Sequence, residues 1–243
     1  MRRIVDAIVL RVVDYGDADR VVTLMTRQLG KVSALARGAR RSRKRFGGAL
    51  GLFGTGQGVL LERRGELWGL ESFDAKRGFP HLGLEVAKVA HGAYACELVR
   101  ELASEAATDE RLFELLAELL GLLDAGDPRA ERLRAFELQL LDLLGFGAVL
   151  DRCLACNRPQ VDRFDAQRGG GLCTKCSDAP TLTPSARTAL LALARLPLAA
   201  APPLGEVAGE VRDLVQALLS QHLRRPLASL DFIAKINRYD ARS

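Results

Sequence analysis

Two closely spaced pairs of cysteines constrain this chain most, because they fix where a local fold must close on itself. Cys153 and Cys156 form one Cys-x2-Cys pair, and Cys173 and Cys176 form a second, with sixteen residues between the pairs. This spacing is typical of a four-thiolate zinc site, in which each pair forms a tight knuckle on one side of the ion. We expect the intervening segment to turn back at its Arg-Gly-Gly-Gly stretch, residues 168–171.

The cysteines also limit the chemistry and the compartment. Four protein ligands leave no position for water, so we predict one structural zinc rather than a catalytic metal. A redox or disulfide role and another metal are the alternatives, although a thioredoxin-like site needs a βαβ setting that is missing here. Cys96 lies in an apolar helical pattern and is expected in a core. No signal peptide or membrane span is recognisable, so we expect a cytoplasmic protein without membrane association.

A basic run lies in the amino-terminal third. No Asp or Glu occurs from Arg20 through Leu61, and six of the nine residues from 37 to 45 are Lys or Arg. Such clustered charges displace several counterions from a phosphate backbone together, and arginine both grips phosphates and stacks on bases. We predict a nucleic-acid contact here, with a solvated loop as the alternative. The predicted contact residues are Arg37, Arg40, Arg41, Arg43, Lys44 and Arg45.

Four further residues are candidates for DNA contact. Phe46 follows the basic run and could stack on a base, or it could simply anchor the loop to the domain beneath. Arg195, Arg224 and Arg225 belong to a net basic carboxyl-terminal segment, although solvated helix faces explain them equally well.

Charge is distributed unevenly along the 243 residues. The net charge is +5, but residues 1–80 hold 16 Lys and Arg against 8 Asp and Glu, whereas residues 81–150 hold 6 against 13. A basic module attached to an acidic segment is expected of a polyanion-binding protein.

The first eighty residues show strand signals. Five short β-branched or alternating segments are separated by turn residues, and glycines are scattered through the fourth. This pattern favours a small closed barrel, in which glycine lets a strand bend, and the OB-fold is the obvious candidate. The expected strands are 7–13, 20–26, 31–36, 58–62 and 67–73.

After Pro80 the apolar period changes to that of helices. Asp127 followed by Pro128 predicts a helix start, Gly145 a helix end, and Thr183 with Pro184 another start. The predicted helices are 84–103, 109–126, 127–145, a stretch from 183, about 206–223 and 227–237.

Together these patterns predict a multi-domain protein of β and α parts. The four expected segments are an OB-fold nucleic-acid-binding domain, a helical domain, a zinc-binding insert, and carboxyl-terminal helices packing with the helical domain. They span residues 1–79, 80–150, 151–180 and 181–243.

Enzyme motifs are weak or absent. The stretch GTGQG at 54–58 resembles a phosphate-binding loop but lacks the Gly-Lys-Ser/Thr ending and a following helix. The three histidines lie far from the cysteines, and no nucleophile elbow or carboxylate pair is recognisable. We therefore expect no catalysis.

Few families join these pieces in this order. The stretch AIVLRVVDYGDADRVVTLMTRQLGKVSALARGARRSRKRFGGAL, followed by the helical middle and LLGFGAVLDRCLACNRP, resembles the bacterial recombination mediators of the RecO family. The resemblance covers most of the chain. It implies an OB-fold, a helical domain and a zinc-binding insert, and it maps the family's basic motif and cysteines onto the residues named above.

The resemblance also implies a function in recombinational DNA repair. The resemblance implies that the protein binds single-stranded and double-stranded DNA and anneals complementary strands. It also implies that, with the partner RecR, the protein helps to load the recombinase RecA onto strands coated by single-strand-binding protein. A protein adaptor without DNA contact is one alternative, and a zinc-dependent nucleic-acid enzyme is another. One departure stands out: the charge follows the third strand, whereas an OB-fold commonly binds through its second and third strands and other loops.

Overall fold

A computed structural model describes residues 1–46, 50–63, 65, 67–76, 78–105 and 108–233. Its contacts group the chain into two compact units. The first comprises Met1–Asp127 together with the stretch from Leu227, and the second comprises Pro128–Pro226. The first unit therefore contains both the amino-terminal strands and the two helices that follow them. The division into four segments that we expect from the sequence remains a prediction.

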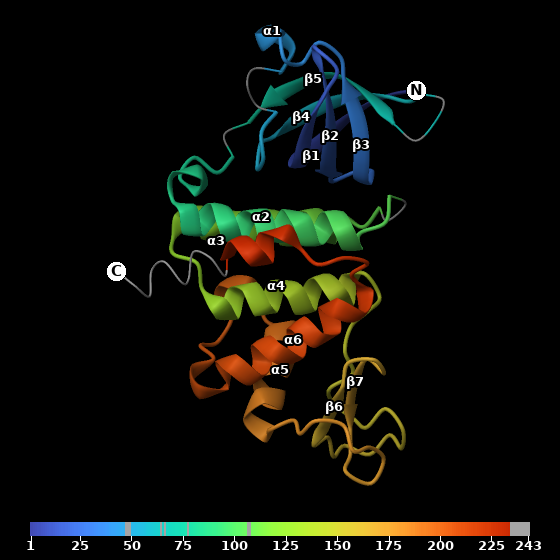
Figure 1. Ribbon diagram of the computed structural model, residues 1–243, viewed down its shortest axis with the longest axis vertical. Coiled ribbons are helices and arrows are strands. Elements are labelled where there is room, and N and C mark those ends of the chain that lie inside the picture. The colour runs from blue at the N-terminus through green and yellow to red at the C-terminus, as the bar shows by residue number, and fades with distance from the viewer. Residues whose placement is uncertain (47–49, 64, 66, 77, 106–107, 234–243) are drawn as a thin grey trace. The chain divides into compact units, whose positions relative to one another are not determined.

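The first unit begins with a closed barrel of five strands (Figure 1). Neighbouring strands follow the order β1-β2-β3-β5-β4, and the one parallel contact joins β3 to β5. The predicted five-stranded OB-fold barrel is confirmed, with strands somewhat longer than expected. Their bounds are β1 Arg2–Tyr15, β2 Asp19–Thr26, β3 Gly30–Ala36, β4 Thr55–Leu61 and β5 Trp68–Ala75.

Strand alternation fills the barrel. Val22 and Leu24 of β2 face Val32 and Ala34 of β3 inside the core, and the residues between them lie outside it. A bulge in β1 at Val9/Arg11 shifts the phase of the alternation, so that Val12 rather than Val13 packs against the core.

The barrel rests on two helices of the same unit, α2 (Val86–Leu102) and α3 (Glu110–Ala125), which follow the 3-10 turn η1 (Leu82–Leu84). Phe53 lies in the turn before β4 with a φ of 68° and contacts Gly92 of α2. A Cβ at residue 92 would approach the Phe53 ring to 2.9 Å, so this close packing needs glycine.

Charged contacts complete the docking of the barrel on its helices. The Arg27 guanidinium donates to Glu110 and Glu114 of α3 and lies 4.7 Å from the centre of the Phe113 ring. The Lys31 ammonium donates to the carbonyl of Arg100 at 2.6 Å, in the last turn of α2, where the helix dipole favours a cation. Burial lowers the pKa of Lys31.

The chain returns to the first unit near its carboxyl end. Residues 228–233 are helical, Leu227 is buried, and the Glu97 carboxylate of α2 accepts hydrogen bonds from the Ser229 backbone N–H at 2.9 Å and hydroxyl at 2.6 Å. Glu97 thus caps the start of this last helical stretch. The helix was predicted to span residues 227–237, and its last four residues lie outside the described part of the chain.

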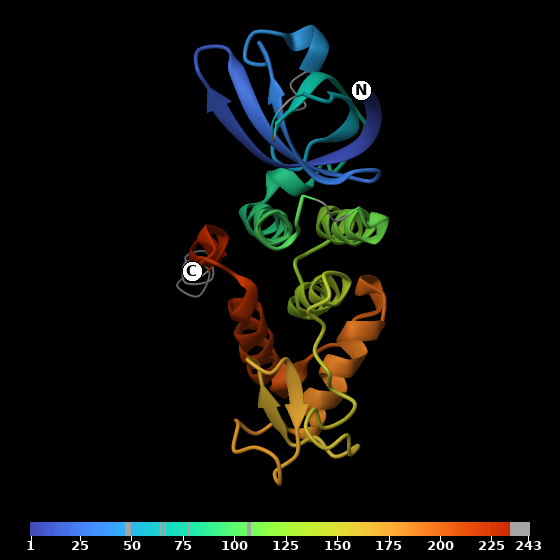
Figure 2. The same ribbon diagram turned by 90° about the vertical axis from the view of Figure 1, so that its right-hand side faces the viewer.

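The second unit contains three helices and a two-stranded insert (Figure 2). The helices are α4 (Ala130–Leu143), α5 (Pro184–Arg195) and α6 (Ala208–His222). Thr183 caps α5 as predicted, and Gly145 adopts the left-handed conformation just after α4 with a φ of 83°. The predicted cap at Asp127 is wrong, because α4 begins at Ala130, after two further residues in extended conformation or loop.

Within the described residues, no helix combines the length and the apolar character that a membrane span needs.

Candidate metal centre and nucleic-acid surface

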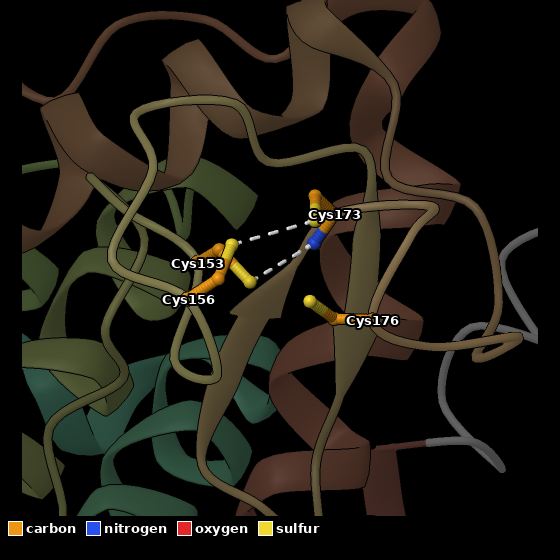
Figure 3. A group of neighbouring side chains, drawn as sticks. All are labelled: Cys153, Cys156, Cys173 and Cys176. Atoms are coloured by element: carbon orange, nitrogen blue, oxygen red, sulfur yellow. Dashed lines mark hydrogen bonds between the residues drawn. The ribbon is translucent and has the colours of Figure 1, made fainter.

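The four paired cysteines converge at one point of the second unit. The sulfur atoms of Cys153, Cys156, Cys173 and Cys176 all lie within 4.8 Å of one another (Figure 3). The first pair precedes the small hairpin of β6 (Arg163–Asp165) and β7 (Gly170–Leu172), and the second pair follows it directly. The predicted convergence is confirmed, and the cluster can bind a metal ion.

Each pair forms a turn that aims its two sulfurs at the same point. The Asn157 N–H donates to the Cys153 carbonyl at 2.8 Å, and the Cys176 N–H donates to the Cys173 carbonyl at 2.9 Å. Asn157 has a φ of 59°, a conformation that asparagine tolerates better than most residues. The Cys156 and Cys173 sulfurs lie 3.7 Å apart.

Hydrogen bonds shift the pKa values of Cys153 and Cys176 in opposite directions. Burial raises the pKa of Cys153, but the backbone N–H groups of Cys156, Cys173 and Ala155 outweigh burial and bring it to about 6. Hydrogen bonds with the Cys173 and Cys156 thiols raise the pKa of Cys176 to about 12. Four adjacent thiolates repel one another, so the fully deprotonated cluster requires a cation.

The insert is held against α5 by one arginine. The Arg187 guanidinium donates to the carbonyls of Leu150, Asp151 and Pro159 at 2.8–3.1 Å. The chain also reverses as predicted but slightly earlier, over residues 166–169. Gly169 has a positive φ in this turn, and Gly170 begins β7. Both features bring the two cysteine pairs together.

In the first unit, the basic run begins as a turn over residues 37–41, called the basic turn below, which is hydrogen-bonded to the β1–β2 hairpin. The Gly38 N–H donates to the Asp19 carboxylate at 2.8 Å, and the Arg40 N–H donates to the Ala18 carbonyl at 3.0 Å. Gly38 has a φ of 67°, which favours glycine at this position. The turn and the short helix α1 (Arg43–Phe46) lie at the end of the barrel opposite α2 (Figure 1).

Two arginines of the run are engaged within the fold. Arg40 pairs with Asp14 at 3.6 Å, and Asp14 also pairs with Arg20 at 3.0 Å. The Arg45 guanidinium donates to the Arg37 carbonyl at 2.7 Å. Acids that precede the basic run in sequence therefore neutralise part of its charge.

Three other cations of the run are exposed. Within the part of the chain that the structure describes, the side chains of Arg37, Arg41 and Lys44 form no hydrogen bond or ion pair. The Arg43 side chain lies outside that description.

The remaining candidates lie in different settings. Phe46 is only 2% exposed and belongs to the barrel core, so its burial favours the anchoring interpretation and withdraws the ring from stacking on a base. Arg195, Arg224 and Arg225 are exposed in the second unit, and their contact with DNA stays a prediction.

Sequence reasoning missed the acids that support the basic turn and one exposed ring beside it. Asp14 and Asp19 flank the β1–β2 turn, and Tyr15 between them is 61% exposed. A signal was present, since Asp-Tyr-Gly-Asp at 14–17 is a turn sequence that places an aromatic residue at a strand end.

Comparison with known proteins covers both units. The family "Recombination protein O N terminal" matches residues 1–79, and "Recombination protein O C terminal" matches residues 84–231. The chain belongs to the RecO family. Among the RecO relatives, the DNA repair protein RecO of Anaeromyxobacter sp. (strain K) is 46% identical over 240 residues, which cover 94% of each chain. Those of Myxococcus xanthus and Geobacter sulfurreducens are both 38% identical, with 95% of this chain covered and 96% and 97% of theirs.

The resemblance inferred from the sequence is therefore confirmed. RecO membership supports a role in recombinational DNA repair. The barrel coincides with the amino-terminal RecO match, and the cysteine cluster lies inside the carboxyl-terminal one.

Proposed function

We propose that this chain is a non-catalytic recombination mediator that binds DNA through the basic turn of its barrel. The observation that carries the proposal is the exposure of Arg37 and Arg41 on a turn that Asp19 and Arg40 hold in place, and of Lys44 in the adjoining helix α1. A fixed turn presents its charges to a phosphate backbone without first having to be ordered, so less binding free energy is lost. Backbone contacts of this kind carry no sequence information, which suits a protein that acts on many sequences.

The mediator role extends to partners. We propose that the protein binds single-stranded and double-stranded DNA in the cytoplasm and anneals complementary strands. Together with RecR it would help to load RecA onto strands coated by single-strand-binding protein. The support is the match to the RecO family over residues 1–79 and 84–231, together with the basic turn. We also propose that the four segments expected from the sequence are the functional parts of the protein. They are the nucleic-acid-binding domain, the helical domain, the zinc-binding insert and the carboxyl-terminal helices, at residues 1–79, 80–150, 151–180 and 181–243.

The cysteine cluster, we propose, holds one structural zinc ion. All four donors are sulfur, the set that zinc prefers in structural sites. In a tetrahedron with Zn–S bonds of about 2.3 Å the sulfurs lie about 3.8 Å apart, and the Cys156 and Cys173 sulfurs are 3.7 Å apart. Four protein ligands would leave no position for water or substrate, so the ion would stabilise the insert.

The DNA proposal is tested by measuring affinity for a single-stranded oligonucleotide against salt concentration. If three exposed cations meet phosphates, log affinity falls against log salt with a slope of about −2, from roughly −0.7 per phosphate. Replacing Arg37, Arg41 and Lys44 by Glu should abolish most of this slope and weaken binding to unrelated sequences alike.

The matched control carries the same charge change elsewhere. Arg129, Arg168 and Arg212 are exposed in the second unit, and their replacement by Glu should change affinity far less. Equal losses for both triple variants would show that net charge alone governs binding. A parent protein that binds RecR but no DNA would favour the adaptor alternative.

A further inference from the structure

The outer face of the barrel carries an apolar row that the basic turn does not explain. Val13 pairs with Val21, Val21 with Leu35, and Leu35 with Gly69, so these four residues cross β1, β2, β3 and β5 in one line. Val13 is 41% exposed, and Val21 and Leu35 lie outside the barrel core cluster although they are partly buried. The row is therefore apolar surface on the outside of the sheet.

Tyr15 extends this row at one end. It lies two residues after Val13 on β1, and side chains two apart point to the same face of a strand. Its ring is 61% exposed, and no described residue forms a hydrogen bond or ring contact with it. An exposed tyrosine beside small apolar residues is a ready surface for a flat, apolar ligand group.

Cations border the row on two sides. The Arg63 side chain lies across Gly69, where a Cβ would approach its Nε to 2.6 Å, so the glycine makes room for the guanidinium. Arg37 follows the end of β3, two residues after Leu35. Two acids lie beside Tyr15, and both are engaged. Asp14 pairs with Arg20 and Arg40, and the carboxylate of Asp19, which pairs with Tyr15 across the strands, accepts the Gly38 N–H.

The other end of the same sheet face is covered. Lys31 donates to the carbonyl of Arg100, and the Ser33 hydroxyl contacts Glu105 at 3.3 Å, both near the carboxyl end of α2. Among the described residues, no such hydrogen bond to α2 or the residues after it covers the end that holds Tyr15 and the apolar row. The open area is thus a defined patch that adjoins the basic turn.

We propose that a single strand of nucleic acid crosses this patch with one base stacked on Tyr15. The apolar row of Val13, Val21 and Leu35 lies beneath neighbouring sugars and bases, and Arg37 and Arg63 contact phosphates. Charge complementarity favours a nucleic acid as the occupant, and the exposed ring favours a single strand, because bases in a duplex are already stacked on one another. The inference rests on the proposed DNA-binding function and adds a base-dependent contact to it.

The test separates base stacking from charge. Affinities of the parent, Tyr15→Ala and Tyr15→Phe are measured for a short oligothymidylate and for an abasic strand of equal length and charge. Tyr15→Ala should lose roughly 5- to 150-fold in affinity for the oligothymidylate, should bind the abasic strand as the parent does, and should keep the parent's salt slope. Tyr15→Phe retains the ring and should bind both strands like the parent.

Phe232→Ala supplies the matched control, since Phe232 is an exposed ring of the same unit in the last helical stretch. It should bind both strands as the parent does. The stacking contact is overturned if Tyr15→Ala binds oligothymidylate as tightly as the parent, or loses equally on both strands, while the parent keeps its salt slope. A parent that binds neither strand overturns the proposed function as well.

Discussion

At the residue scale, the basic run divides into supporting and exposed cations. Arg40 bonds to the β1–β2 hairpin through both its backbone and its guanidinium, whereas the side chain of Arg41 beside it forms no hydrogen bond or ion pair with a described residue. The first residue holds the shape of the turn, and the second is available to a ligand. We therefore expect substitution of Arg40 to affect the turn and substitution of Arg41 to affect DNA binding, although both residues are arginines.

Arg40→Gln and Arg41→Gln test this division. Arg40→Gln removes the pair with Asp14 and should speed hydrogen exchange of the backbone amides at residues 38–42, because the turn loses its anchor. Arg41→Gln should leave exchange unchanged and weaken single-strand binding by roughly 0.5–1 kcal/mol, a two- to fivefold loss. Identical exchange in both variants would refute the supporting role of Arg40.

This division could not be predicted from the sequence. Six cations in nine residues indicated a polyanion contact, but the distance of Asp14 and Asp19 from those cations depends on the pairing of β1 with β2 and of β2 with β3. For the same reason Phe46 was ambiguous, because a ring that follows a basic run is equally suited to stacking or to burial. Tertiary packing placed it in the core.

At the element scale, local chemistry predicted most of the architecture. Strand alternation located the barrel, Thr183 with Pro184 located α5, and the cysteine spacing located the insert. At Asp127 the local pattern was misleading. Arg129 is extended and occupies the N-cap position, so Pro128 precedes α4 instead of lying in its first turn.

The predicted metal content is one zinc ion per chain. Replacing both Cys153 and Cys173 by Ser should remove it and make residues 151–180 sensitive to protease, because ligation contributes directly to local folding. Metal analysis and limited proteolysis measure the two effects. Cys96→Ala is the control: Cys96 is buried in α2, so its loss should leave the metal content unchanged. Metal-free parent protein with an equally resistant insert would contradict the assignment.

Arg187 should govern how firmly the insert keeps its metal. Arg187→Ala leaves three carbonyls without their donor and should lower the free energy of local opening by about 1.5–3 kcal/mol, the value of hydrogen bonds to a charged group. Zinc should then pass faster to a chelator, although the four ligands remain. Arg195→Ala on the same helix is the control, since Arg195 is exposed. Equal rates of zinc loss in the two variants would argue against the clamp.

At the scale of the whole molecule, the chain leaves the first unit at Asp127 and returns to it at Leu227. Glu97 holds the returning segment through Ser229, and Arg100 pairs with the same carboxylate at 3.1 Å. Burial raises the pKa of Glu97, but hydrogen bonds from Ser229 and the charge of Arg100 outweigh it, so the pKa lies below the usual range. The carboxylate form thus stabilises the folded state.

Glu97→Gln should lower the free energy of unfolding by about 1–2 kcal/mol at neutral pH. Because the folded pKa is lowered, the stabilising effect of Glu97 is complete above the ordinary glutamate pKa and disappears as the pH falls through the folded value. Parent and variant should therefore converge in acid. Urea unfolding at a series of pH values measures the difference, and a gap that persists unchanged into strong acid would refute the account. Glu118→Gln, exposed on α3, is the control.

The return of the chain has a consequence for biosynthesis. A ribosome makes the barrel and α2 first, yet the residues that Glu97 caps are made only after the whole second unit. The part of α2 that binds Ser229 through Glu97 is therefore open throughout translation of the intervening hundred or so residues, and it closes only once Ser229 has emerged. A messenger truncated just before codon 227 would yield both units without the segment that completes the first.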